Sequence, residues 1–158
     1  MKKTEIKVPI EAYTYAELDD ARQRLVDLAR EYTHNAYSPY SHFSVGAAIR
    51  LDNGEIVCGA NQENAAFPSG TCAERSACYS AGARFPGSKF EAIAIASRDT
   101  NGEFTSKPTA PCGACRQALL EYETLAGHSV EVILAGKDEI YVLPSVASLL
   151  PLSFSEFE

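Results

Sequence analysis

Helix-like and strand-like spacings of apolar residues follow one another along the chain, and each change of period marks a predicted element. Between Leu18 and Tyr32, apolar residues recur at helical spacing. Thr14 and Glu17, just before and at the start of this stretch, match the T-x-x-E capping box that opens many helices. The sequence therefore predicts a helix over residues 15–35.

Five short segments rich in β-branched or small apolar residues, bounded by turn residues, predict strands. They are residues 45–51, 55–59, 90–97, 130–135 and 141–143. Between the first two, D-N-G at residues 52–54 is typical of a hairpin turn. Residues 90–97 place isoleucines on one face and alanines on the other, so we expect this strand to be buried on both faces.

Two further helices are predicted over residues 71–84 and 112–122, together with a helical turn over residues 145–150. Pro111 stands near the first position of the second helix, where its fixed φ suits a helix start. After the initial hairpin, helices alternate with strands, which indicates a mixed sheet with helices on both faces.

We expect one domain over residues 1–158, because dividing the 158 residues would leave each half too small for a good core. The prediction is an α/β fold, a three-layer α/β/α domain with a mixed five-stranded sheet, preceded by an N-terminal extension over residues 1–13. Only residues 136–140 separate the last two strands. They are too few for a parallel crossover, so these strands should pair antiparallel.

The composition excludes several classes of function. The chain carries 14 Lys and Arg against 21 Asp and Glu, and the net charge of −7 repels polyanions, so we do not expect a nucleic-acid partner. No apolar run approaches the length of about 18 residues that spans a membrane, and the charged N-terminus does not resemble a signal peptide. We therefore expect a cytoplasmic protein with no membrane partner, whose five cysteines are not a disulfide framework.

The strongest chemical signal is C-A-E-R at residues 72–75, followed by P-C-G-A-C at residues 111–115. Cys112 and Cys115 share one face of a helix's first turn, and Cys72 stands at another predicted helix start. Helix N-termini favour negative charge, so all three thiols are biased toward thiolate. Three thiolates without an obvious fourth protein ligand are typical of a zinc site with an open position for water.

Glu74 lies two residues from Cys72, close enough to move a proton at the open position of the metal without binding it. Alone, C-A-E-R is equally typical of an ordinary helix start with a first-turn acid and a buried cysteine. Together with P-C-G-A-C it favours the zinc site. Cys58 and Cys78 lie outside this pattern, and we interpret them as small buried residues.

The pattern C-A-E followed by P-C-x-x-C resembles that of the zinc-dependent deaminases. Further blocks resemble the small homotetrameric cytidine deaminases, in family order and over most of the chain: residues 38–48, 61–66, 72–75, 111–117 and 149–154. The resemblance implies a cytoplasmic homotetramer with one Zn²⁺ per subunit. It also implies hydrolytic deamination of cytidine and deoxycytidine to uridine and deoxyuridine, with release of ammonia, in pyrimidine salvage.

By this resemblance, Cys72, Cys112 and Cys115 hold the zinc, and ionised water at the metal attacks C4 of the pyrimidine. Glu74 takes the proton from that water, protonates N3 and assists the departure of ammonia. Arg75 donates hydrogen bonds to the thiolates and offsets the excess negative charge that three thiolates leave on Zn²⁺.

The resemblance also implies that Asn61 and Glu63 bind the ribose 3′-hydroxyl. A carboxylate at this place repels phosphate, so a free nucleoside fits better than a nucleotide. In an unmatched sequence, the same pair would be an ordinary polar loop after a strand. Phe43 is implied to stack on the base, although its ring is also typical of a core position.

Three further contacts rest on the resemblance alone. Ala73 is implied to touch the substrate, and Phe67 stands where many relatives have tyrosine, which removes a hydroxyl from the pocket wall. Phe154 is implied to reach the site of a neighbouring subunit; otherwise it is a frayed aromatic near the C-terminus. The role of Arg116 stays open.

Three alternatives remain at this point. A nucleic-acid-editing deaminase with the same zinc core is disfavoured by the net charge of −7 and by the short link over residues 136–140, where by resemblance those enzymes use a helical crossover. A deaminase of another aminopyrimidine nucleoside, such as a nucleoside antibiotic, would carry much the same zinc pattern. A non-catalytic zinc-stabilised module would have no use for Glu74 beside an open metal position.

Overall fold

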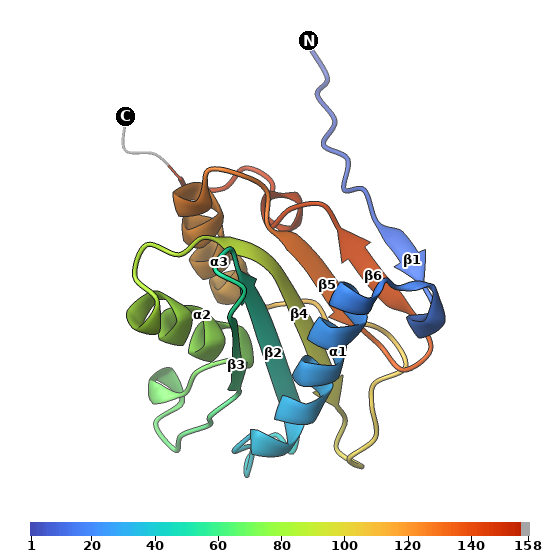
Figure 1. Ribbon diagram of the computed structural model, residues 1–158, viewed down its shortest axis with the longest axis vertical. Coiled ribbons are helices and arrows are strands. Elements are labelled where there is room, and N and C mark those ends of the chain that lie inside the picture. The colour runs from blue at the N-terminus through green and yellow to red at the C-terminus, as the bar shows by residue number, and fades with distance from the viewer. Residues whose placement is uncertain (156–158) are drawn as a thin grey trace.

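A mixed sheet of six strands forms the middle layer of the computed structural model, which describes residues 1–155 (Figure 1). Its strands are β1 (Glu11–Tyr13), β2 (Ser44–Leu51), β3 (Ile56–Ala60), β4 (Phe90–Arg98), β5 (Glu131–Ala135) and β6 (Ile140–Leu143). They lie side by side in the order β1-β6-β5-β4-β2-β3. β4 and β5 run parallel, and the other neighbours pair antiparallel, including β5 and β6 as their short link predicted.

The sheet has one strand more than the five predicted. The additional strand, β1, consists of residues 11–13, which the sequence analysis placed in the N-terminal extension. It pairs antiparallel with β6, with Ala12 opposite Tyr141, and so covers an edge that β6 would otherwise expose. Three residues are too few to show a period, so the hydrophobic pattern could not reveal this strand.

Helices cover both faces of the sheet, which confirms the predicted three-layer α/β/α fold (Figure 1). α1 (Asp20–Tyr32) packs on one face, and α2 (Ala73–Arg84) and α3 (Gly113–Ala126) pack on the other. Ile93 and Ile95 of β4 are buried on the side of α2 and α3, and the alanines between them are buried beneath α1. Within residues 1–155, no helix has the length and apolar character needed to cross a lipid bilayer.

The helix predicted over residues 15–35 is interrupted near its start. The capping box opens only a 3₁₀ turn, Tyr15–Glu17, because Leu18 is extended with φ −74° and ψ 145°. α1 begins after Asp19, whose side chain accepts a hydrogen bond from the backbone N–H of Arg22 at 2.9 Å. The prediction of a helix here is therefore confirmed, but its start is wrong, because a second capping residue takes over.

Gly59 in β3 sets how closely α2 approaches the sheet. A Cβ atom at this position would lie 2.5 Å from the backbone N of Ala77 and 2.7 Å from the backbone O of Ala73. The missing side chain therefore lets the first turns of α2 rest directly on the strand. Because Cys72 immediately precedes α2, this contact also determines where the Cys72 thiol lies.

Glu123 of α3 is a buried carboxylate that the sequence analysis did not single out. Its Oε2 accepts hydrogen bonds from the backbone N–H groups of Val130 at 2.8 Å and Val146 at 2.7 Å, and its Oε1 accepts one from Ala147 at 3.0 Å. Val130 directly precedes β5, and Val146 and Ala147 lie in the turn after β6. Glu123 therefore fastens the C-terminal part of the chain to α3.

Replacing Glu123 with alanine is expected to destabilise the fold. The substitution leaves backbone N–H groups without their acceptor, and we expect the free energy of unfolding to fall by at least about 2 kcal/mol. Urea unfolding of the purified variant measures this loss. Glu121→Ala, on the exposed side of the same helix, is the matched control and should change the free energy by less than about 0.5 kcal/mol. Equal midpoints for the two variants would contradict the role of Glu123.

Candidate functional site

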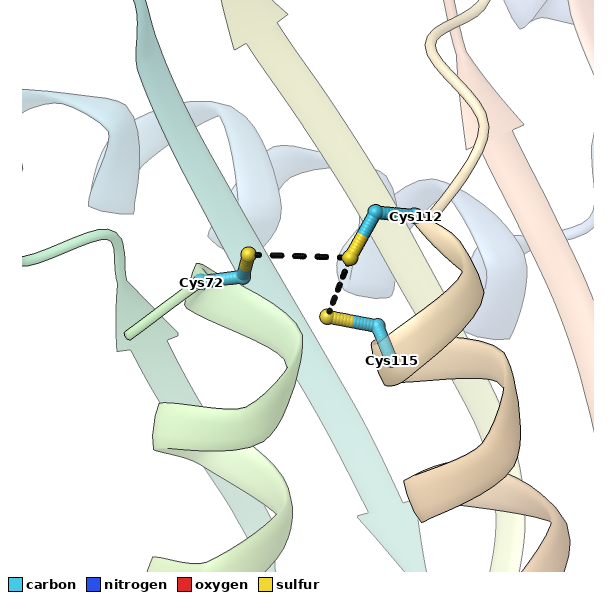
Figure 2. Close-up of side chains that lie close together, drawn as sticks. All are labelled: Cys72, Cys112 and Cys115. Atoms are coloured by element: carbon cyan, nitrogen blue, oxygen red, sulfur yellow. Dashed lines mark hydrogen bonds between the residues drawn. The ribbon is translucent and has the colours of Figure 1, made fainter. Parts of the chain in front are cut away.

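Three cysteine side chains converge between the N-termini of α2 and α3 (Figure 2). Cys72 is the N-cap residue of α2, Cys112 is the N-cap residue of α3, and Cys115 lies in the first turn of α3. The Sγ atom of Cys112 lies 3.9 Å from that of Cys72 and 3.5 Å from that of Cys115. All three sulfur atoms lie within 4.8 Å of one another, which makes them a possible metal site.

The geometry and chemistry of this cluster fit zinc. Four-coordinate zinc holds thiolate sulfurs about 2.3 Å away, which places two such sulfurs about 3.8 Å apart in a tetrahedron. Cys115 is buried, Cys72 is half-buried and Cys112 is exposed, so the cluster is open on one side. Cys58 and Cys78 lie outside it, and burial raises the pKa of their thiols to about 11 and about 12. Cys78 is buried as predicted, whereas Cys58 is only half-buried at the surface of the core.

The thiols of Cys72 and Cys115 differ in the direction of their pKa shifts. Hydrogen bonds from Cys115, Arg75 and Cys112 lower the pKa of the Cys72 thiol to about 5, although partial burial opposes them. The same hydrogen bond with Cys72 raises the pKa of Cys115, and burial adds to the effect. The contacts around Cys72 therefore favour its thiolate form.

Arg75 contacts this cluster from the first turn of α2. Its Nη2 lies 3.8 Å from the Sγ atom of Cys72. Its Nε is buried and finds no hydrogen-bond partner within residues 1–155. The guanidinium thus brings positive charge to a place where three thiolates would repel one another.

Glu74 is held in the first turn of α2, and only 4 % of it is exposed. Burial raises the pKa of its carboxyl group, and the negative charge of Cys72 adds to this rise. A carboxyl group in this environment keeps a proton to higher pH than an exposed one, so it is suited to exchange protons with a reacting group. Ala73, just before it, is fully buried against the sheet.

A cleft of about 500 Å³ adjoins the thiol of Cys72. Asn61, Glu63, Phe67 and Arg75, all singled out in the sequence, line it together with Cys72. Its volume lies in the range of about 300–1,000 Å³ that is usual for small-molecule sites. The fold thus brings the predicted sugar-binding loop and the thiol cluster to one opening.

The amide of Asn61 is partly occupied by the protein's own backbone. Its Oδ1 accepts a hydrogen bond from the N–H of Val45 at 2.7 Å, and its Nδ2 donates to the carbonyl O of Phe43 at 2.9 Å. An Asn side chain offers two donor hydrogens and an acceptor oxygen with two lone pairs. One hydrogen and one lone pair therefore remain for a ligand.

Glu63 is likewise bound to the loop on the other side of the cleft. Its Oε2 accepts hydrogen bonds from the backbone N–H of Tyr40 at 2.9 Å and of Ser41 at 3.2 Å, and its Oε1 accepts one from the hydroxyl of Ser41. These bonds lower the pKa of the carboxyl group, with the hydroxyl of Ser41 the largest cause. Sequence analysis did not select Ser41, although it lies inside the block over residues 38–48.

The remaining predicted contacts are less closely associated with the cleft. Its lining within residues 1–155 includes neither Phe43, which is half-buried before β2, nor Phe154. The ring of Phe67 is 74 % exposed and packs edge-on against Tyr40, with the ring centroids 5.8 Å apart. Phe154 is 63 % exposed, and its carbonyl O accepts a hydrogen bond from Gln117 at 2.9 Å.

Arg116, whose role the sequence left open, is engaged with the protein backbone. Its Nε donates to the carbonyl O of Pro111 at 2.9 Å, and its Nη1 donates to that of Leu149 at 2.7 Å. The first bond stabilises the turn that carries Cys112, and the second joins α3 to the C-terminal segment. Arg116 therefore supports the position of a thiol rather than touching the cluster.

Comparison with known proteins places these features in a family. A family model described as the cytidine and deoxycytidylate deaminase zinc-binding region matches residues 19–126, which include the three clustered cysteines and Glu74. The cytidine deaminase of Sporosarcina psychrophila is 37 % identical over 137 residues, which are 85 % of this chain and 91 % of that protein. The cytidine deaminase of Halalkalibacterium halodurans is 36 % identical over 134 residues, or 85 % of this chain and 94 % of that protein.

Solved structures agree with the sequence relatives. The crystal structure of the cytidine deaminase from Burkholderia pseudomallei superposes with a TM-score of 0.71 and 40 % sequence identity, over 83 % of this chain and 97 % of that one. The crystal structure of the cytidine deaminase from Mycobacterium tuberculosis superposes with a TM-score of 0.69 and 30 % sequence identity, over 87 % of this chain and 100 % of that one. Both likenesses extend over most of this chain.

Removing one thiol of the cluster is expected to remove the metal. Purified Cys112→Ala should contain little zinc by elemental analysis, because two thiolates and open solvent bind zinc far more weakly than three thiolates. Cys58→Ala, which removes a thiol outside the cluster, should keep the zinc content of the unaltered protein. Wild-type zinc content in Cys112→Ala would show that the ligand set is wrong.

Proposed function

The chain belongs to the cytidine deaminase family, and from this premise we propose that it hydrolyses cytidine and deoxycytidine to uridine and deoxyuridine with release of ammonia. The observation that carries the proposal is buried Glu74, held in the first turn of α2 two residues after Cys72. Cys72 itself belongs to the thiol cluster and lines a cleft large enough for a nucleoside. A metal cluster that served stability alone would not require a buried, protonatable carboxyl group two residues from one of its thiols.

Cys72, Cys112 and Cys115 are proposed to hold the zinc of this family. When bound, zinc supplies a Lewis acid that lowers the pKa of a water molecule at its open position and so makes a nucleophile available at neutral pH. Arg75 offsets the excess charge of the three thiolates, because its guanidinium already donates to Cys72. The N-termini of α2 and α3 contribute further positive potential at the same place.

Glu74 is proposed to move the protons of the reaction. Its carboxylate accepts one proton of the attacking water and delivers it to N3 of the pyrimidine. It then carries the proton of the new C4 hydroxyl group to the amino group, so that the C4–N bond breaks, ammonia leaves and C4 becomes a carbonyl. The sum is one water molecule consumed and one ammonia released per nucleoside, with the carboxylate regenerated. The raised pKa of the Glu74 carboxyl group supports this role, because it brings proton uptake closer to neutral pH.

Asn61 and Glu63 are proposed to select the sugar. Both side chains keep hydrogen-bonding capacity beyond the backbone contacts that hold them, and both line the cleft. Glu63 accepts hydrogen bonds from hydroxyl groups but repels a phosphate, so the proposed substrates are nucleosides rather than nucleotides. Phe43 and Ala73 are proposed to contact the base.

The wider setting is also a proposal that rests on the family. We infer a cytoplasmic homotetramer with one zinc per subunit, in which Phe154 extends toward the site of a neighbour, and a role in pyrimidine salvage. The short antiparallel connection between β5 and β6 supports a nucleoside deaminase over a nucleic-acid-editing one, as does the net charge of −7.

The first test is a panel of four compounds followed by loss of absorbance in the pyrimidine band. Cytidine and deoxycytidine should turn over, whereas cytidine monophosphate and cytosine should react at least about tenfold more slowly, because Glu63 repels phosphate and the free base lacks the sugar contacts. Zinc is measured on the same sample. A zinc-loaded protein that leaves both nucleosides unchanged would overturn the proposed substrate class.

Glu74→Gln is expected to keep the fold and the zinc but to lose at least about 100-fold in kcat, since an amide cannot exchange the proton. Thermal unfolding and zinc analysis of the same preparation separate lost chemistry from lost structure. The exposed Glu121→Gln serves as the matched control and should retain full activity. Near-normal kcat in Glu74→Gln would remove Glu74 from the proposed mechanism.

A further inference from the structure

The hydroxyl of Ser41 joins two residues that the proposed function places on different parts of a nucleoside. It donates a hydrogen bond to Oε1 of Glu63 and accepts one from the backbone N–H of Phe43 at 3.1 Å. The backbone N–H of Ser41 also donates to Oε2 of Glu63 at 3.2 Å. A single serine therefore contacts both oxygens of the carboxylate and, at the same time, the peptide group of Phe43.

The backbone around Ser41 is shaped for this double contact. His42, between Ser41 and Phe43, has a φ of 55°, a left-handed conformation that non-glycine residues adopt only when surrounding contacts hold it. Its N–H donates to the carbonyl O of Ser38 at 3.0 Å and closes the turn. This turn brings the N–H of Phe43 back over the hydroxyl of Ser41. The strained residue is thus compensated by contacts that Ser41 and Ser38 provide.

The three hydrogen bonds to Glu63 are divided unequally between its two oxygens. Both backbone N–H groups, from Tyr40 and Ser41, bind Oε2. The hydroxyl of Ser41 binds Oε1, so it determines the rotation of the carboxylate about its last bond. A carboxylate accepts about four hydrogen bonds, and with three in place one acceptor position remains, pointing in a fixed direction.

We propose that Ser41 is a positioning residue that orients the Glu63 carboxylate to accept a hydrogen bond from the sugar 3′-hydroxyl. This inference rests on the proposed function, because it requires a nucleoside in the cleft that Ser41 and Glu63 line. Ser41 acts through Glu63 and does not take part in the chemistry at the thiol cluster. Its removal affects recognition of the sugar and leaves proton transfer at Glu74 unchanged.

The test compares substrates with and without the 3′-hydroxyl. In Ser41→Ala, the KM of cytidine should rise about tenfold and kcat should stay within about twofold, as expected for the loss of one charge-assisted hydrogen bond in binding. The inhibition constant of 2′,3′-dideoxycytidine, which lacks the hydroxyl, should stay within about twofold of the wild-type value. Ser41→Thr keeps a hydroxyl and should restore the KM of cytidine.

Ser38→Ala is the matched control, because the Ser38 hydroxyl lies in the same loop but contacts Ser44 at 3.2 Å rather than Glu63. It should leave the KM of cytidine within about twofold of wild type, as for a contact that does not reach the substrate. Ser41→Cys provides a second variant with a weak donor of similar size and should repeat the effect of Ser41→Ala. Adding Ser41→Ala to Glu63→Gln should raise the KM no further, since both changes remove the same contact.

Several results would overturn the assignment. Equal weakening of cytidine and 2′,3′-dideoxycytidine in Ser41→Ala would mean that the loop had collapsed generally. An unchanged or lower KM for cytidine, or a double variant whose effects add, would mean that Ser41 does not act through Glu63. A wild-type protein that turns over no nucleoside would overturn the proposed function, and Ser41's role with it. Normal wild-type turnover with an unaffected Ser41→Ala would overturn the role of Ser41 alone.

Discussion

The site depends on the convergence of two helix N-termini above one face of the sheet. α2 and α3 pack on the same side of β4, and their first turns bring three sulfur atoms within 4.8 Å of one another. Such an approach requires small residues where the elements touch. Gly59 lets α2 rest on β3, and a Cβ at Gly82 would lie 2.6 Å from the hydroxyl of Tyr122 on α3. A bulkier residue at Gly59 would meet the backbone of α2 and force this helix away from the sheet, whereas one at Gly82 would have to displace the ring of Tyr122.

The electrostatics of the site follow from this convergence. Thiolates repel one another, and the repulsion is stronger in a partly buried place than in water. Two helix N-termini and the guanidinium of Arg75 oppose this repulsion. The pKa of Cys72 is low because Cys115, Arg75 and Cys112 donate hydrogen bonds to its sulfur. The same surroundings act in the opposite direction on Glu74, whose carboxyl group is buried next to negative charge and so holds its proton more firmly. One arrangement therefore acts in opposite directions on the pKa values of a thiol and a carboxyl group two residues apart, which are the proposed metal ligand and the proposed proton carrier.

The side of the cleft that Asn61 and Glu63 line is built on a second principle. Asn61 and Glu63 bind the backbone of the loop over residues 40–45, so the groups proposed to select a substrate also hold the fold of that loop. Ser41 completes the link between the two segments. The side chains proposed to recognise a ligand are thus the same ones that hold the loop, so a substitution that alters one role is expected to alter the other.

The sequence by itself determined the elements whose signal is local. Periodicity and turn residues within a few positions predicted the β2–β3 hairpin, the burial of β4 on both faces, and the helices that follow Cys72 and Cys112. The structure confirms all of them. The antiparallel pairing of β5 and β6 was also predictable, because chain length limits how far a short link can reach.

Only the tertiary structure decided which distant residues meet. β1 exists because β6 offers it an edge, and Glu123 and Arg116 matter because the C-terminal segment returns to α3. Ser41 has no pattern of its own, and its partner Glu63 is brought near by the pairing of β2 with β3 and by the backbone bridge between Tyr37 and Gln62. Such contacts leave no period in the sequence, since the partners are far apart along the chain and any one of them, taken alone, is an ordinary polar residue.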